Sequence, residues 1–259
     1  MISANLSGKK ALVTGAASGI GYATAELLAA NGCQVAINDL PDNPRLAEAV
    51  SALQAKGLKV IAAPGDAGAA ETATAMVTRA IEDMAGLDYL VNNAGTPGTK
   101  TPIPPHDLET PDQAFWERLL GINLLGPWFC TRAAIPALTK NNGAIVNTAS
   151  IAGIVGNGSS SVYAAGKAAL INLTKEHARA FGPEVRVNAI APGVVDSAWE
   201  CRFDRTDEFL ASIPMKRSGV PADYAEAILF LCAGGSYITG HTLVVDGGLT
   251  AGPSANKKT

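Results

Sequence analysis

The sequence lacks the residues that build a metal centre or a disulfide framework. Its 259 residues include only four cysteines and three histidines. None of them forms a Cys-x-x-Cys or a paired-histidine motif, and scattered cysteines of this kind are typical of free thiols in a reducing compartment. We therefore expect a cytoplasmic protein with no metal site, whose free thiols are Cys33, Cys130, Cys201 and Cys232.

The sequence also lacks a strong charge of either sign and long apolar runs. Its formal net charge is −3, which favours neither nucleic acid nor an anionic membrane as a partner. No apolar stretch reaches the length of a membrane span, and the first ten residues lack the apolar core of a signal peptide. The mild acidic charge indicates nothing more about a partner.

Short apolar segments alternate with helical ones along the chain. We expect strands at 10–14, 34–38, 58–63, 87–91, 143–149, 185–190 and 242–245. Helices are expected at 20–31, 44–56, 70–84, 112–138, 161–181 and 221–232. Strands that alternate with helices predict βαβ units, and strands rich in Val, Ile, Leu and Ala are buried on both faces. The predicted fold is α/β, a doubly wound parallel sheet of about seven strands with helices on both faces, in one domain over 1–259.

Three segments have no such pattern. Residues 96–111 are rich in proline and threonine and predict a loop. Residues 197–220 are polar with scattered aromatics, and we expect a mobile lid that binds the substrate. Residues 251–259 predict a flexible tail.

A glycine-rich turn joins the first strand to the first helix. It reads Thr-Gly-Ala-Ala-Ser-Gly-Ile-Gly over 14–21, and its glycines allow backbone N–H groups to approach a pyrophosphate at a helix N-terminus. The alternative is a tight connection without a ligand. Asp39, at the end of the second strand, favours NAD because a carboxylate accepts from both ribose hydroxyls and repels the 2′-phosphate of NADP. No Arg or Lys occupies positions 18, 38 or 40, although Asp39 could also be a solvated loop residue.

A tyrosine and a lysine lie four residues apart at the start of the helix expected over 161–181. This spacing puts Tyr163 and Lys167 on one helix face. A lysine cation beside a phenol lowers the pKa of the phenol, which can then exchange a proton with an alcohol. Ser150 follows an expected strand thirteen residues upstream and could hydrogen-bond the same substrate oxygen. Taken alone, Tyr-x-x-x-Lys is a weak signal.

Seven motifs in order resemble those of the short-chain dehydrogenase/reductase family over essentially the whole chain. They are the turn at 14–21, Asn-Asn-Ala-Gly at 92–95, Asn123, the set Ser150, Tyr163 and Lys167, Pro-Gly at 192–193, Tyr-Ile-Thr-Gly at 237–240 and Val-Asp-Gly-Gly at 245–248. The resemblance implies a Rossmann-like fold and assembly as a homotetramer or homodimer. The contacts between subunits would come from the helices expected over 112–138 and 161–181 and from the C-terminal region.

The resemblance also implies site residues. Asn123, Ser150, Tyr163 and Lys167 would be catalytic. The residues that would bind the cofactor are Gly15, Ser18, Gly19, Ile20, Gly21, Asp39, Leu40, Asp66, Ala67, Asn93, Ala94, Gly95, Tyr163, Lys167, Pro192, Gly193, Val195 and Ser197. Ser197 stands where the family usually has threonine and keeps the hydroxyl.

Pro127 lies four residues after Asn123 in an expected helix and removes the helical donor to the Asn123 carbonyl. One hypothesis is that this carbonyl holds a relay water beside Lys167. The other is that Pro127 only kinks the helix for packing.

The expected substrate contacts are Ser150, Ile151, Asn157, Tyr163 and Trp199. The polar run at 157–161 would suit a hydroxylated substrate, but serines before a helix also serve as caps. Basic side chains in the expected lid could bind an anionic group or form a solvated face; they are Arg202, Arg205, Lys216 and Arg217.

The leading hypothesis is therefore an NAD-dependent oxidoreductase, an alcohol dehydrogenase or ketoreductase. It would transfer a hydride between nicotinamide and a secondary alcohol or ketone, with Tyr163 as general acid/base and a sugar, polyol or other hydroxylated small molecule as substrate. A second hypothesis is a 3-oxoacyl-thioester reductase, although Asp39 disfavours the NADPH that reductive biosynthesis uses. A third is a non-catalytic NAD-binding regulator, because the fold alone does not decide function.

Overall fold

A computed structural model describes residues 3–196 and 206–252, and its centre is one seven-stranded parallel sheet. The strand order is β3-β2-β1-β4-β5-β6-β7. The strands are Lys10–Val13 (β1), Gln34–Ile37 (β2), Val60–Ala62 (β3), Tyr89–Asn92 (β4), Ala144–Thr148 (β5), Arg186–Pro192 (β6) and Thr242–Val245 (β7). The sheet confirms the predicted fold class, and each strand lies within two residues of its predicted bounds.

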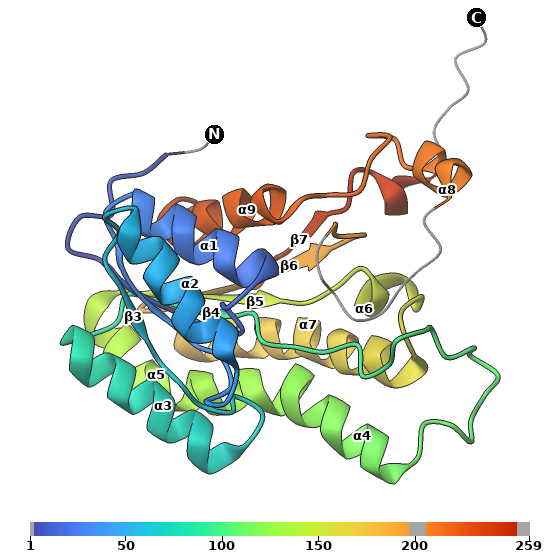
Figure 1. The fold of residues 1–259 in the computed structure, drawn as a ribbon, viewed down its shortest axis with the longest axis horizontal. Helices are drawn as coiled ribbons and strands as arrows, with labels where there is room; N and C mark the ends of the chain where they lie inside the picture. Colours follow the sequence, from blue (N-terminus) through green and yellow to red (C-terminus); the bar gives the residue numbers. More distant parts are fainter. Residues whose placement is uncertain (1–2, 197–205, 253–259) are drawn as a thin grey trace, which may run out of the picture.

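Helices cover both faces of the sheet (Figure 1). They are Gly19–Ala30 (α1), Pro44–Ala55 (α2), Ala70–Met84 (α3), Gln113–Leu120 (α4), Gly126–Asn141 (α5), Ala152–Val155 (α6), Ser161–Phe181 (α7), Asp207–Ser212 (α8) and Pro221–Ala233 (α9). Helices α1, α2 and α9 pack on one face and α3, α5 and α7 on the other. Successive strand residues point to opposite faces, so Val13 joins the first core and Leu12 the second. This double burial explains the continuous apolar runs of the strands.

The strand order reverses between β1 and β4. From β1 the chain continues outward to β2 and β3, then returns to β4 beside β1 and continues the other way. Parallel sheets bind ligands beyond the carboxyl ends of their strands at such a switch point. The glycine-rich turn follows β1, and Asn93 follows β4. The topology therefore brings these two sequence motifs to the same edge of the sheet.

The helix predicted over 112–138 is wrong as one regular α-helix. Between α4 and α5 lies a π-helical segment, Gly121–Leu125, in which the Gly126 N–H donates to the Gly121 carbonyl five residues back. Pro127 is the second residue of α5 and follows the π-helical segment directly. The proline thus marks a change of helix type.

The C-terminal third differs from expectation in smaller ways. The short helix α8 lies in the segment at 197–220 that was expected to be irregular, and the short helix α6 lies in a segment for which no element was predicted. Of the predicted lid, 197–205 lie outside the described residues, as do 253–259 of the predicted tail. Within the described ranges, no helix combines the length and the apolar character that crossing a membrane requires.

Candidate active site

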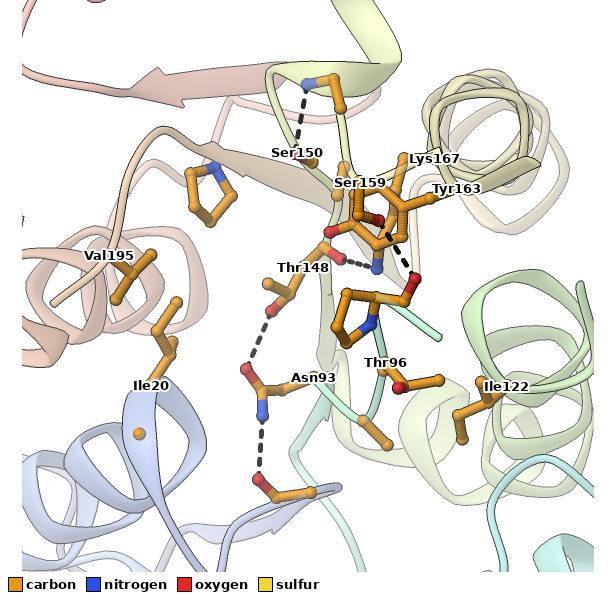
Figure 2. A pocket seen from close by; sticks show the side chains of 18 of the residues that line it. Ile20, Asn93, Thr96, Ile122, Thr148, Ser150, Ser159, Tyr163, Lys167 and Val195 are labelled. Carbon is orange, nitrogen blue, oxygen red and sulfur yellow. Dashed lines mark hydrogen bonds between the residues drawn. The ribbon is translucent and has the colours of Figure 1, made fainter. Parts of the chain in front are cut away.

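A cavity of about 1300 Å³ opens at the carboxyl ends of the strands (Figure 2). It brings together nineteen of the predicted site residues: Gly15, Ser18, Gly19, Ile20, Asp39, Leu40, Asp66, Ala67, Asn93, Ala94, Gly95, Ser150, Ile151, Asn157, Tyr163, Lys167, Pro192, Gly193 and Val195. Ser197 and Trp199 lie outside the described residues. Gly21 and Asn123 are buried and do not line the cavity.

The glycine-rich turn needs its glycines for two different reasons. Gly15 and Gly19 have φ angles of 61° and 58°, in the left-handed region that side chains disfavour. Gly21 has no such angle, but a Cβ on it would lie 2.6 Å from the Asn93 Nδ2 atom. The missing side chain lets α1 approach the end of β4. Ser18 makes no side-chain cap to α1, so the first N–H groups of this helix remain available to a phosphate at the cavity wall.

Hydrogen bonds fasten the loop after β4 to the glycine-rich turn. Asn93 Nδ2 donates to the carbonyls of Thr14 at 3.0 Å and Gly15 at 3.1 Å. Thr14 Oγ1 accepts the N–H groups of Asn93 at 2.9 Å and Ala94 at 3.0 Å, and Thr148 Oγ1 donates to Asn93 Oδ1 at 3.4 Å. Thr14 was missed as a site residue, although it opens the glycine motif. Its side chain holds two cavity walls together.

Polar residues around β2 form the far end of the cavity. Asn38 Nδ2 donates to the carbonyls of Ala63 at 2.9 Å and Gly65 at 2.8 Å, which fixes the loop after β3 beside Asp39. The exposed side chain of Arg45, in the first turn of α2, lines the same cavity. The sequence neighbours of Asp39 include no Arg or Lys at 38 or 40, whereas the structure places Arg45 on the same cavity as Asp39.

Ser150, Tyr163 and Lys167 gather at one end of the cavity, with Ile20 and Asn93 towards the other (Figure 2). Ser150 follows β5, and its Oγ accepts the Ala152 N–H at 3.1 Å. Tyr163 and Lys167 lie on α7, and Lys167 Nζ is 5.7 Å from the centre of the Tyr163 ring. Helix α7 begins where expected because Ser160 accepts the Tyr163 N–H at 3.1 Å. The helix cap thus fixes the backbone of Tyr163.

Lys167 is buried and donates to the Thr148 carbonyl at 2.8 Å. Removal from water disfavours its charged form and lowers the pKa of Lys167 to about 7. Burial therefore moves the titration of this amine towards neutral pH. The influence of Lys167 on Tyr163 depends on pH in the range where the amine titrates, which the sequence did not indicate.

Asn123 is fully buried in the π-helical segment. Its Nδ2 donates to the carbonyls of Thr96 at 3.0 Å and Leu119 at 3.1 Å, while its Oδ1 has no partner among the described residues. A Cβ on Gly95 would lie 2.8 Å from this Oδ1 and 3.5 Å from Lys167 Nζ. The amide oxygen of Asn123 and the Lys167 amine thus flank Gly95. The role of the Asn123 carbonyl as a water ligand stays a prediction.

The polar run before α7 is used largely inside the protein. Ser160 caps α7, and Ser159 is buried and donates to the Pro97 carbonyl at 3.1 Å. Asn157 lines the cavity. Several apolar side chains also line the cavity, among them Pro97, Ile151, Val155, Val195, Phe209 and Leu249.

Two of the four basic residues named for an anionic substrate are engaged elsewhere. Arg217 forms a bidentate pair with Asp223 at 2.6 and 2.9 Å, and Lys216 donates to the Ala211 carbonyl. Neither lines the cavity. Arg202 and Arg205 lie outside the described residues.

Comparisons with known proteins agree with this architecture. Residues 15–250 match the family model described as enoyl-(acyl carrier protein) reductase. The cis-4-hydroxycyclohexanecarboxylate dehydrogenase of Sinomonas cyclohexanicum is 39% identical over 246 residues, which are 93% of this chain and 96% of that protein. The 3-oxoacyl-[acyl-carrier-protein] reductase of Staphylococcus aureus is 35% identical over 93% of this chain and 98% of its own.

A solved structure extends the comparison to three dimensions. A Brucella melitensis protein described as a short-chain dehydrogenase/reductase of the glucose/ribitol dehydrogenase type superimposes with a TM-score of 0.85. It is 32% identical, and the match covers 96% of this chain and 99% of that one. The chain belongs to the short-chain dehydrogenase/reductase family. Its members are oxidoreductases that use a nicotinamide cofactor on alcohols and ketones.

Proposed function

We propose that this protein is an NAD-dependent dehydrogenase that interconverts a secondary alcohol and its ketone, with Tyr163 as the general acid/base. One observation carries the proposal. Tyr163, Lys167 and Ser150 line the same cavity as the glycine-rich turn and Asp39. The cavity therefore contains both a phenol that can transfer a proton and a turn that can bind a dinucleotide.

The cavity fits a dinucleotide by its own geometry. Gly15 passes so close to Ala94 that a Cβ would lie 2.8 Å from the Ala94 Cα, and the uncapped N-terminus of α1 opens beside it. Gly19 and Ile20 would hold the pyrophosphate through backbone N–H groups, and Asp39 would accept from the adenosine ribose. Asn93 to Gly95 would form the floor. When bound, nicotinamide supplies or accepts the hydride.

The protein manages the proton. In the oxidative direction, the Tyr163 phenolate takes the proton of the substrate hydroxyl, while the Ser150 hydroxyl hydrogen-bonds the substrate oxygen. Protonated Lys167 stabilises the phenolate from 5.7 Å, measured to the ring centre. In the reductive direction the same phenol returns the proton. The Oδ1 atom of Asn123 has no partner among the described residues and lies close to Gly95 and Lys167. It would accept a hydrogen bond in the path by which the proton passes to solvent.

The described wall supports a substrate that is apolar around the reacting carbon. Ile151, Val155 and Phe209 contribute apolar surface, whereas Ser159 and Ser160 are used by the fold. This favours a compact, partly apolar secondary alcohol among the hydroxylated small molecules predicted from sequence. The name of the Sinomonas relative, a hydroxycyclohexane derivative, supports the same class.

The main alternative is reduction of a 3-oxoacyl thioester, the reaction in the name of the Staphylococcus relative. The two hypotheses differ in the cofactor that they require, since Asp39 favours NAD whereas reductive biosynthesis uses NADPH. The test is the initial rate with NAD and with NADP over a panel of alcohols, sugars and hydroxy acids. A preference for NAD of at least about tenfold, which is 1.4 kcal/mol, supports the proposal. A preference for NADP together with turnover of 3-oxoacyl thioesters would overturn it.

A third possibility, a non-catalytic NAD-binding regulator, is disfavoured by the presence of Ser150, Tyr163 and Lys167 together in the cavity. It would be supported if the panel gave no turnover and NAD still bound. The same titration that measures NAD binding separates this outcome from misfolding.

We also propose that the protein assembles through α4, α5 and α7. Trp116, Leu125 and Trp128 expose 40%, 44% and 43% of their surface on the first two of these helices and the π-helical segment between them. Trp128 stacks on His177 of α7 with ring centres 5.3 Å apart. Exposed aromatic side chains that cluster in this way are typical of subunit interfaces. Light scattering of the wild type and of Trp116→Glu would test whether a dimer or tetramer forms through this face.

A further inference from the structure

The carboxylate of Asp39 is held from one side by a residue of the next helix. Asn43 Nδ2 donates to Asp39 Oδ1 at 2.9 Å, and the Leu40 N–H donates to the same oxygen at 2.9 Å. The other oxygen, Oδ2, receives the N–H of Ala17 at 3.4 Å. Both Asp39 and Asn43 line the cavity. The short hydrogen bonds thus occupy Oδ1, and Oδ2 keeps most of its capacity to accept.

The orientation of Asn43 is itself fixed. Asn43 is the N-cap of α2, and its Oδ1 accepts the Arg45 N–H at 3.2 Å. Because an amide NH₂ group cannot accept this bond, the oxygen must face the helix and the NH₂ group must face Asp39. Pro44 in the first turn and the Asn43 N–H bond to the Leu40 carbonyl at 3.1 Å hold the backbone. The donor to Asp39 is therefore preorganised by a helix cap.

We propose that Asn43 is a positioning residue for cofactor selectivity. This rests on the proposed NAD-dependent function. By tethering Oδ1, Asn43 keeps Oδ2 of Asp39 directed to the ribose hydroxyls and keeps the negative charge where a 2′-phosphate would lie. Without Asn43, only the Leu40 N–H holds Oδ1 at short range, and the broad terminal torsion of Asp39 lets the carboxylate turn further from the ribose. Arg45 lines the same cavity and then offers a cation to the 2′-phosphate.

The variant that isolates this role is Asn43→Ser. Serine keeps an acceptor for the helix cap, so the stability of α2 is retained, but it has no amide donor for Asp39. Dissociation constants of NAD and NADP are measured by calorimetric titration of the full chain, together with the unfolding temperature. We expect the ratio of the NADP to the NAD dissociation constant to fall about fivefold to tenfold, because a hydrogen bond to a charged group is lost.

The same substitution in an Asp39→Ala protein tests whether Asn43 acts by positioning Asp39 or has a general structural role. If Asn43 acts through Asp39, then Asn43→Ser made in an Asp39→Ala protein changes the ratio by less than about twofold. A matched control is Asp112→Ser. Asp112 is the N-cap of α4, and it does not line the cavity. This control should leave the ratio unchanged.

The inference is overturned by an unchanged ratio in Asn43→Ser, or by an equal change with and without the Asp39 carboxylate. Failure of the proposed function gives a different result, since it shows as a preference of the wild type for NADP. The effect of Asn43 is read from the change in the ratio between wild type and variant, so it is measured whichever cofactor the wild type prefers.

Discussion

The cofactor side and the substrate side of the cavity are built in different ways. The cofactor side consists of the ends of β1, β2 and β4 and the turns directly after them, cross-linked by Thr14, Asn38 and Asn93. The proposed substrate side is lined by residues of the loops at 96–111 and 156–160 and by Phe209 of α8. Ser159 joins these two loops to each other, since its carbonyl accepts the Ile103 N–H at 2.8 Å and its hydroxyl donates to the Pro97 carbonyl at 3.1 Å.

This difference separates the groups proposed for catalysis from those proposed for substrate selection. Groups that must be held within a fraction of an ångström, such as Tyr163 and Lys167, lie on a long helix packed on the sheet. The residues proposed to select the substrate lie largely on loops, which change shape at little cost to the core. We therefore expect substitutions on the cofactor and catalytic side to reduce turnover or cofactor binding strongly, and substitutions on the substrate side to change KM mildly.

The largest effect is expected for Tyr163→Phe. Loss of the proton-transfer group should lower kcat about a thousandfold, while NAD binding stays within twofold, since the ring remains. The measurement is NADH formation on any substrate found in the panel, with calorimetric titration of NAD. Tyr237→Phe is the matched control, because that side chain is fully exposed at 102%. Activity above one tenth of the wild type in Tyr163→Phe would contradict the assignment.

Lys167→Met should lower kcat about a hundredfold and yet raise the unfolding temperature without cofactor. Burial depresses the pKa of Lys167 from the model-compound value of 10.5 to about 7, so between these values the unfolded chain binds more protons. The cost of the buried lysine is therefore complete below pH 7 and disappears as pH rises towards 10.5.

Thermal unfolding of wild type and Lys167→Met at pH 6 to 10 tests this sign. The wild type should be less stable than the variant at pH 6, and the difference should shrink at pH 10. Lys175→Met, an exposed position on the same helix, should show neither the stabilisation nor the loss of activity. A pH-independent difference would mean that Lys167 does not titrate in this range.

Gly21→Ala should weaken NAD binding about tenfold and destabilise the protein by about 1–3 kcal/mol, because the new methyl group overlaps the Asn93 amide and the Gly15 carbonyl. Calorimetric titration and denaturant unfolding give both values. Gly57→Ala is the comparison, since Gly57 has a φ of 77° but no atom within 4 Å of its Cβ position. It should lose stability through backbone strain alone and bind NAD normally.

The smallest effect is expected on the substrate side. Val155→Ala should change KM by up to about threefold and kcat by less than twofold, because a half-exposed methyl pair contributes only about 1 kcal/mol of contact. Steady-state kinetics measure both constants. Ile154→Ala on the same short helix does not line the cavity and should change neither. A large loss of kcat in Val155→Ala would remove the distinction between the two sides.

Local patterns predicted the regular part of the fold. The bounds of α3, α7 and β7 agree with the sequence because a cap, a proline or a change of apolar period marks each end. The π-helical segment at Gly121–Leu125 was not predicted, and its Asn123 side chain donates to the carbonyl of Thr96, which lies in a loop distant in the sequence. The short α6 lies against α7, where Gly153 leaves room for the Lys167 backbone, and no local signal reports that contact.

The sequence by itself determined the glycine-rich turn, Asp39 and the Ser150, Tyr163 and Lys167 set, because motif spacing and strand order bring these residues to one edge of a parallel sheet. Only the tertiary structure decided that burial shifts the pKa of Lys167 and that Asn43 and Arg45 join Asp39. The physical reason is that desolvation and the return of a helix towards an earlier strand depend on how distant segments pack. The spacing of residues along the chain reports neither the desolvation of Lys167 nor the return of α2 towards the end of β2.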